Sequence, residues 1–414
     1  MEQNEFRWKK KAILFLSSQA VTLFGSSLVQ FAMVWFVTLK TSSGTWVSAL
    51  SVCAFLPQFL ISFVAGVWAD RYPRKRLIIL ADGVIAVTTL ILALSIPHLE
   101  NDTVLLSAIL VTSAIRSLGA GIQLPAVNAV IPQLVPDSQL MRFNGLNATV
   151  QSVVQFAAPA AAGAILTLGT LPQTLFIDVA TAIVGIGFLA AIAIPKTAAQ
   201  QDAPASMLED LRIGVRYVFS TGFLKKLLLM YGGFIFLCVP AGFLATLFVS
   251  REYGDSYLYL TVVEVVGFIG MAAGGLLISI WGGFPNRVKT LIAGMSFFGA
   301  LAVGMGVVDS FIVYLVCMLI YGVTLTMVQT ATTTLLQEKA EPSMQGRVFG
   351  FLSTMYSGAL PLGMAVFGPL ADVVSLRLLM IGSGAILLLL ALLLRLDRPF
   401  FLAGGAPATA STEK

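Results

Sequence analysis

The sequence predicts an all-α integral membrane protein in which twelve transmembrane helices form two parallel six-helix repeats. Hydrophobic residues make up 57% of the chain and charged residues only 11%, against roughly 45–50% and about 25% in soluble domains. The mean hydropathy is +0.91. Backbone groups in lipid must be satisfied internally, and the apolar runs far exceed the ~10 alternating residues of a barrel strand. These observations favour helices.

A basic cluster between the second and third apolar runs sets the orientation. Four cations lie between Arg71 and Arg76, and such clusters accumulate in loops on the cytoplasmic side. With the amino terminus inside, 21 of the 25 Lys and Arg residues fall in cytoplasmic segments and only three fall outside. We therefore expect both termini in the cytoplasm, and the net charge of +5 reflects this bias, not nucleic-acid binding.

Twelve apolar runs are long enough to span a bilayer, and the Pro and Gly within several of them predict bends rather than breaks. The first follows the basic segment Arg7–Lys11 and is too long for a signal peptide, so it is expected to be retained. The predicted spans are Ala12–Leu39, Thr45–Ala69, Leu77–Ile96, Thr103–Gln123, Phe143–Leu168, Thr174–Ile194, Leu224–Ser250, Tyr257–Trp281, Thr290–Val308, Phe311–Thr332, Val348–Asp372 and Leu376–Leu396.

The two halves of the chain repeat each other in outline. Residues 131–133 recur at 335–337, and residues 142–145 recur at 347–350. Six helices is an even number, so both copies enter the membrane from the same side. The expected domains are an N-terminal bundle (1–195), a cytoplasmic linker with an amphipathic helix (196–223), a C-terminal bundle (224–397) and a tail (398–414).

Several motifs carry a family resemblance that covers nearly the whole chain. The segment from Gly66 to Arg76 resembles the major facilitator superfamily signature between helices two and three. Five further segments resemble the macrolide-efflux, drug:proton antiporter branch: 116–119, 124–130, 134–136, 337–339 and 346–349. Two departures are Pro73, where the signature usually has Gly, and the Ala-rich segment 157–163, where antiporters typically have a Gly-Pro-rich motif.

The resemblance implies a major facilitator fold, alternating access and proton-coupled export of amphiphilic drugs, with macrolides the first candidates. It also implies a conformational latch, in which Asp70 caps the start of the eleventh helix and locks the two halves on the inner side. A carboxylate at a helix N-terminus contributes about 0.3–1 kcal/mol. The alternative is that the cluster only anchors the topology. The latch residues are Gly66, Asp70, Arg74, Arg76 and Arg347.

Three charged residues within spans are candidates for proton coupling: Asp178, Glu264 and Arg116. Charges in a bilayer are costly unless paired or neutralised, so a carboxylic acid there can load and release protons as a cavity changes sides. Static hydrogen bonding is the alternative for the two acids. Arg116 is expected to pair with an acid or with backbone carbonyls, in a structural or a proton-relay role. Asp82 is interpreted as a local partner of Lys75 and Arg76.

Amides and aromatic rings within the spans suit a cavity for large amphiphilic drugs. Gln151 and Gln155 are four residues apart and share a helix face. Each such residue has helix packing as its alternative role. The substrate-binding candidates are Gln30, Trp35, Gln58, Gln151, Gln155, Phe236 and Gln329.

Other classes of protein lack support in the sequence. The single histidine, His98, falls in an outer loop, and no Ser-His-acid arrangement, Walker loop or metal-ligand spacing is present, so we expect no enzyme activity, no cofactor and no metal. Cys53, Cys238 and Cys317 are interpreted as small core residues. A channel or scramblase does not explain the basic loop and the repeat, whereas an exporter of another compound, such as a siderophore, or a small-solute importer remains an alternative.

The expected partners are an amphiphilic small molecule, protons and membrane lipid, with no nucleic acid. We expect a monomer in the bacterial cytoplasmic membrane. The sequence leaves open whether a partner ATPase contributes.

Overall fold

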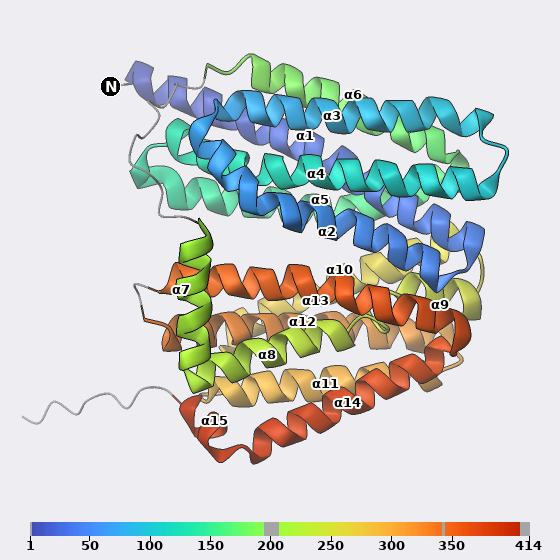
Figure 1. Ribbon diagram of the computed structural model, residues 1–414, viewed down its shortest axis with the longest axis vertical. Helices are drawn as coiled ribbons and strands as arrows, with labels where there is room; N and C mark the ends of the chain where they lie inside the picture. The colour runs from blue at the N-terminus through green and yellow to red at the C-terminus, as the bar shows by residue number, and fades with distance from the viewer. Residues whose placement is uncertain (1, 194–206, 342–343, 406–414) are drawn as a thin grey trace, which may run out of the picture. The chain divides into compact units, whose positions relative to one another are not determined.

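The computed structural model describes residues 2–193, 207–341 and 344–405, and in these ranges the chain is helical without strands (Figure 1). The first helices are α1 (Glu2–Thr41), α2 (Gly44–Arg71), α3 (Arg74–Ser95), α4 (Asp102–Leu134), α5 (Leu140–Leu168) and α6 (Leu171–Ala190), with short 3₁₀ turns at Ile96–His98 and Asp137–Gln139. The others are α7 (Met207–Ser220), α8 (Gly222–Leu237), α9 (Ala245–Glu252), α10 (Tyr257–Trp281), α11 (Arg287–Val307), α12 (Phe311–Lys339), α13 (Gln345–Val373), α14 (Leu376–Leu396) and α15 (Arg398–Ala403).

Eleven of the described helices are long and apolar enough to cross a membrane. The exception is the predicted seventh span, Leu224–Ser250, for which a bend but no break was expected. That expectation is wrong, because the span is divided into α8 and α9 by turns over residues 238–244. Pro240 lies in the middle of this segment and has no backbone N–H to continue the helical ladder. The chain makes short-range bonds instead, such as Gly242 N to Cys238 O at 2.9 Å.

The fourth span is longer than predicted. It was expected to end at Gln123, but α4 continues through Pro125 and Pro132 to Leu134. Prolines are tolerated in membrane helices when neighbouring groups satisfy the freed backbone. The start of α4 is fixed by Asn101, whose side chain accepts hydrogen bonds from the backbone N–H of Thr103 at 2.8 Å and Val104 at 3.3 Å.

The chain divides into two compact units. The first comprises Met1–Ser42, Trp46–Pro204 and Gly254–Val262, and the second comprises Ser43–Thr45, Ala205–Tyr253 and Val263–Lys414. The α1–α2 turn at Ser43–Thr45 is thus grouped with the second unit, although the helices on either side of it belong to the first. Within the predicted linker, residues Met207–Ser220 form the helix α7. Linker residues 196–206 and tail residues 406–414 lie outside the described part of the chain.

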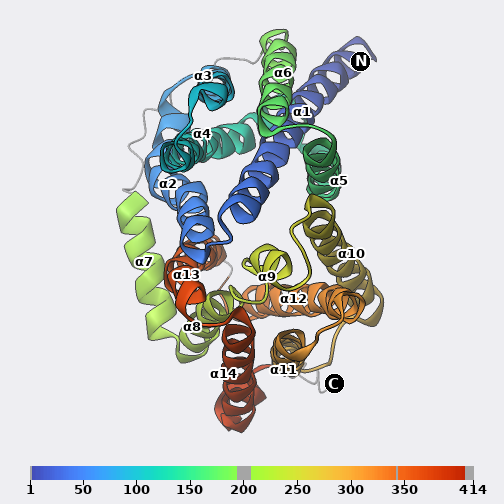
Figure 2. The ribbon, with the colours of Figure 1, turned by 90° about the vertical axis from the view of Figure 1, so that its right-hand side faces the viewer.

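In the first unit, α1 packs against α4, α5 and α6, and α3 packs against α4 and α6 (Figure 2). One apolar cluster joins the first turns of α1 to the end of α2, the start of α3 and the end of α4, and it includes Phe15, Ala69, Ile78 and Val130, all nearly inaccessible to solvent. This cluster holds the end of the unit from which the basic segment projects.

In the second unit, α11 and α14 pack closely and lie side by side in both views (Figures 1 and 2). Gly299 of α11 and Gly384 of α14 meet at their centre. A Cβ on Gly299 would lie 2.8 Å from the carbonyl oxygen of Gly384, and a Cβ on Gly384 would lie 2.6 Å from that of Gly299. Small residues allow the two backbones to approach this closely.

Candidate functional site

A buried ion pair lies inside the first unit. Arg116 of α4 binds Asp178 of α6, and their side chains are only 7% and 2% exposed. Arg116 Nη1 also donates to the hydroxyl of Thr89 on α3, and its Nη2 donates to the carbonyl of Ser26 on α1 at 3.4 Å. The expected acid partner of Arg116 is therefore Asp178, and four helices contribute to the group.

The space for Asp178 depends on a small residue in α1. A Cβ on Gly25 would lie 2.9 Å from Asp178 Oδ1 and 2.0 Å from the hydroxyl oxygen of Thr181. Thr89 completes the group by donating to Asp178 Oδ2 at 3.3 Å or to the carbonyl of Ile85 at 2.8 Å. The guanidinium and carboxylate charges compensate each other in a buried place that water does not reach.

Like the contact between Thr89 and Arg116, a second polar pair joins α3 to α4. Gln123 Nε2 donates to Asp82 Oδ1 at 2.7 Å, whereas Asp82 Oδ2 is buried without a partner among the described residues. Asp82 precedes Thr89 by seven residues, and Gln123 follows Arg116 by seven. Seven residues are two helical turns, so the antiparallel helices present two successive polar pairs, roughly 10 Å apart.

The sequence-based interpretation of Asp82 as a partner of Lys75 and Arg76 is wrong. The ammonium group of Lys75 donates instead to the carbonyls of Ala190 and Ile192, each at 2.7 Å, at the end of α6. Carbonyls at a helix C-terminus lack intrahelical donors and attract cations. They therefore hold Lys75, and Asp82, two turns further along α3, binds Gln123.

The predicted latch residues occupy the end of α2, the start of α3 and the start of α13. Arg74 donates to the carbonyls of Ala69 at 2.9 Å and Ala129 at 2.7 Å, while Arg76 is exposed. Arg347 Nη1 contacts Met344 Sδ at 3.3 Å. A Cβ on Gly66 would meet nothing within 4 Å. The side chain of Asp70 lies outside the described part of the structure.

Glu264 lies in the second unit, half-buried on α10. Among the described residues it has no hydrogen bond or ion pair. Two buried tyrosines of the same unit, Tyr314 and Tyr321, lie on α12. The hydroxyl of Tyr314 also has no partner among the described residues. Tyr321 Oη lies 3.6 Å from Cys238 Sγ, where α8 ends. The sequence did not indicate the contact between Tyr321 and Cys238 at the break in the seventh span.

The predicted substrate-binding residues occupy varied environments. Trp35 is fully buried, its ring centroid is 5.7 Å from that of Phe31, and its Nε1 has no partner among the described residues. Phe236 packs on Phe367 with centroids 5.1 Å apart. Gln151 and Gln155 are both exposed on α5, whereas the amides partly shielded from solvent are those of Gln30, Gln58 and Gln329.

Thr89, Gln123 and Tyr321 belong to no motif of the sequence and were not predicted as site residues. For the first two a signal existed: Asp82 and Thr89 share one face of the predicted third span, and Arg116 and Gln123 share one face of the fourth. Each pair of polar positions at a seven-residue spacing indicates a polar face inside an apolar helix. No comparable pattern marks Tyr321. Its contact is with Cys238, which lies at the break between α8 and α9.

Comparisons with known proteins agree with this architecture. The Major Facilitator Superfamily model matches residues 15–364. Macrolide efflux protein A of Streptococcus pyogenes is 28% identical over 388 residues, covering 93% of this chain and 95% of that protein. Multidrug efflux pump Tap of Mycobacterium bovis is 24% identical and covers 91% of this chain and 90% of that protein. The crystal structure of a D-xylose-proton symporter matches in fold, with a TM-score of 0.71, 14% identity, and coverage of 96% and 99%.

Removing one member of the buried ion pair should destabilise the protein more than removing both. Arg116→Ala leaves the Asp178 carboxylate buried without its counter-charge, which typically costs about 3–5 kcal/mol. The double variant Arg116→Ala/Asp178→Ala carries no buried charge and should regain much of this loss. Thermal unfolding in detergent, followed by size-exclusion fluorescence, measures the difference. A double variant no more stable than Arg116→Ala would contradict a direct electrostatic coupling.

Proposed function

Because the chain belongs to the Major Facilitator Superfamily, we propose that it exports amphiphilic drugs, macrolide antibiotics first among them, in exchange for protons. The similarity to Macrolide efflux protein A along 93% of this chain carries the proposal. The similarity to a multidrug efflux pump over 91% of the chain supports the direction of transport. This multi-pass membrane protein would work by alternating access between its two units as a secondary active transporter.

The proposed site of action is the bacterial cytoplasmic membrane, with both termini in the cytoplasm. The distribution of Lys and Arg supports this orientation, since 21 of 25 fall on one side of the predicted topology. The same orientation places the basic segment Arg71–Arg76 inside and the α1–α2 turn outside. Protons would move inward through the protein as the drug moves out.

We assign the proton-carrying role first to Glu264 and a supporting role to Arg116 and Asp178. A proton on Asp178 would leave the Arg116 guanidinium without its counter-charge in a buried site, so exchange there would disturb the four-helix group. Glu264 has no such partner among the described residues, and it is half-buried on α10. It can therefore gain and lose a proton without breaking an ion pair.

The latch proposal rests on the motif from Gly66 to Arg76. Asp70 would bind the N-terminus of α13, near Arg347, when the transporter opens outward, because helix N-termini attract carboxylates. Arg74 supports the loop geometry by joining the end of α2 to α4. The alternative is that the segment serves only as a topological anchor.

For the substrate, we propose contact with a mixed set of amides and aromatic rings. Gln151 and Gln155 are exposed on one face of α5 and suit the polar atoms of a large drug. Trp35 and Phe236 would act from packed positions. The residues proposed to contribute are Gln30, Trp35, Gln58, Gln151, Gln155, Phe236 and Gln329.

Two alternatives belong to the same superfamily. One is export of another amphiphile, such as a siderophore, and the other is import of a small solute. The fold likeness to a D-xylose-proton symporter does not favour import, since one fold hosts many functions. Direction and substrate are therefore tested directly.

Expression in a drug-hypersensitive bacterial host should lower macrolide accumulation severalfold relative to an empty vector. Collapse of the proton gradient should restore accumulation, because export against a concentration gradient needs that energy source. Radiolabelled macrolide uptake measures both effects, alongside a panel of unrelated drugs. Accumulation that rises on expression would indicate import, and a change limited to another compound would replace the macrolide assignment.

Glu264→Gln should reduce pH-driven drug flux in proteoliposomes by at least about tenfold, in line with the usual contribution of a proton-transfer group. The amide keeps the shape of the side chain but cannot release a proton. Asp178→Asn should also reduce flux, with a loss of thermal stability that Glu264→Gln does not share. Membrane insertion, checked by yield and size exclusion, should remain intact for Glu264→Gln. If both variants retain full gradient-driven flux, proton coupling belongs to other residues.

Asp70→Ala should slow transport turnover severalfold while drug binding persists. The substitution removes the carboxylate from the proposed latch and leaves the basic residues that set topology. Equilibrium binding of a labelled macrolide and the initial rate of flux separate the two properties. Arg71→Gln, at an exposed residue of the same segment that is not among the proposed latch residues, provides a control for the change of one charge. Undiminished turnover in Asp70→Ala would contradict the latch and would support a purely topological role for the segment.

A further inference from the structure

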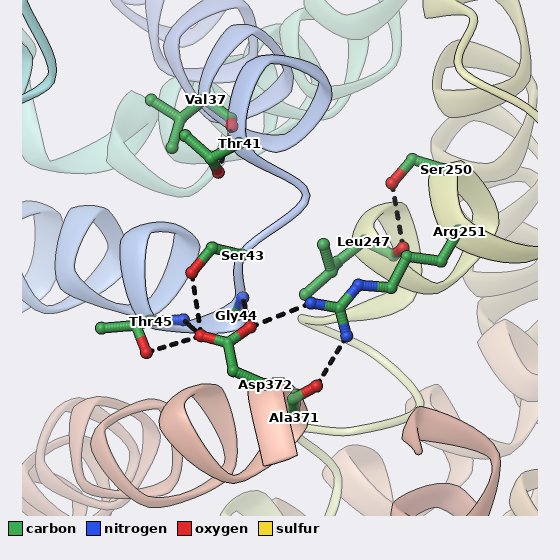
Figure 3. A network of polar contacts seen from close by, with 10 residues as sticks. All are labelled: Val37, Thr41, Ser43, Gly44, Thr45, Leu247, Ser250, Arg251, Ala371 and Asp372. Atoms are coloured by element: carbon green, nitrogen blue, oxygen red, sulfur yellow. Dashed lines mark hydrogen bonds and ion pairs between the residues drawn. The ribbon is translucent and has the colours of Figure 1, made fainter. Parts of the chain in front are cut away.

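One carboxylate at the end of α13 collects an unusual number of donors (Figure 3). Asp372 Oδ1 accepts from the backbone N–H of Gly44 at 2.6 Å, and its Oδ2 accepts from the N–H of Thr45 at 2.9 Å. The same Oδ2 accepts from the hydroxyls of Ser43 at 2.8 Å and Thr45 at 2.6 Å. These donors belong to the α1–α2 turn and to the first residues of α2, whose N–H groups have no partner within the helix.

Arg251, at the end of α9, holds this carboxylate from the opposite side. Its Nη2 lies 2.9 Å from Asp372 Oδ1, and its Nη1 donates to the carbonyl of Ala371 at 2.6 Å. Figure 3 shows the guanidinium bridging the last turn of α13 to the carboxylate. A carboxylate bound to both an arginine and a helix N-terminus makes charge-assisted hydrogen bonds, which are stronger than neutral ones.

The backbone of the turn fits α13 closely. A Cβ on Gly44 would lie 2.2 Å from the carbonyl oxygen of Gly368 and 2.9 Å from the Cβ of Ala371. The chain enters the turn through Ser42, whose φ of 45° lies in the left-handed region that non-glycine residues rarely adopt. Only Ser42 and Ser43 separate α1 from α2. The polar contacts and the steric fit thus fix the same three residues, Ser43–Thr45.

We propose that Asp372, positioned by Arg251, is an outer latch that holds the α1–α2 turn and releases it when the transporter opens outward. The proposal rests on the alternating-access function and topology proposed above. Ser43–Thr45 are grouped with the second unit, whereas α1 up to Ser42 and α2 from Trp46 belong to the first. Any movement of one unit against the other therefore acts on this turn. Asp372 is a positioning residue and does not need to contact the drug.

The exposure of the network suits a contact that forms and breaks. The side chains of Arg251 and Asp372 are 26% and 27% exposed, so water can replace part of the lost bonds on release. The Arg116–Asp178 pair, at 7% and 2% exposed, would leave both charges unsolvated if it separated. The two ion pairs therefore differ in kind: one is suited to a fixed core and the other to a reversible contact.

The second unit provides a matched control. Glu252 accepts from Arg377 at 2.9 and 2.7 Å, and this pair has almost the same exposure, 29% and 28%. Its partners lie outside Ser43–Thr45. Glu252→Gln thus removes an arginine-bound carboxylate of similar exposure, one residue from Arg251, without touching the turn.

The latch is tested by a distance measurement on the full chain in lipid nanodiscs, without drug or gradient. Spin labels are attached at Glu100→Cys and Ser310→Cys, both exposed positions in connections of different units. The background has Cys53, Cys238 and Cys317 replaced, and it is accepted when its yield, thermal stability and size-exclusion profile match those of the unmodified chain. Asp372→Asn should raise the ratio of long to short label distances about tenfold, since unpairing a charged hydrogen-bond network shifts an equilibrium by at least that factor. Glu252→Gln should leave the distribution unchanged.

Two further variants keep the test decisive if Asp372→Asn does not fold. Ser43→Ala/Thr45→Val removes two hydroxyl donors and keeps the ion pair, so a smaller shift in the same direction is expected. Arg251→Gln should shift the ratio as Asp372→Asn does. An unchanged distribution in the folded variants, or an equal shift in Glu252→Gln, would overturn the latch. Because no drug or proton gradient is present, the result stands or falls separately from the macrolide and proton-coupling proposals.

Discussion

Hydrocarbon offers no hydrogen bonds, so each polar group placed within a membrane helix must find its partner inside the protein. In the first unit this constraint gathers four helices around Arg116, whose guanidinium is shared among a carboxylate, a hydroxyl and a backbone carbonyl. It also places the cations at the start of α3 against carbonyls at the ends of α2 and α6. The basic segment that suggested topology is therefore also a structural joint between helices.

The same constraint separates what the sequence could predict from what it could not. Hydropathy and charge identified the spans, because a long apolar run between charged loops has few other stable conformations. They could not show that the seventh span divides at residues 238–244, since Pro and Gly bend some membrane helices and interrupt others. α4 illustrates the opposite result, because it continues through Pro125 and Pro132. Neighbouring helices decide between the two outcomes.

For the candidate site, single charges were recognised more readily than their partners. Arg116 and Asp178 were each visible as lone charges in apolar segments, but their pairing requires the packing of α4 against α3 and of α3 against α6. Asp82 was assigned to nearby cations in the sequence, whereas its hydrogen bond comes from Gln123, 41 residues away. Proximity along the chain is a poor guide in a bundle, where facing positions on antiparallel helices are far apart in sequence. The donors of Asp372 in the α1–α2 turn were not recognisable for the same reason, being more than 300 residues distant.

The glycine contact between α11 and α14 has a consequence for how substitutions combine. Gly299 and Gly384 each lack a Cβ at the place where the other helix presents its backbone oxygen. In a scan of single substitutions, both positions should lose stability, although both belong to a single contact between α11 and α14. Their effects should therefore not add. A side chain added at either glycine would clash with the main chain of the facing helix. A second substitution at the other glycine cannot relieve this clash, so no compensatory pair of substitutions is expected at this contact.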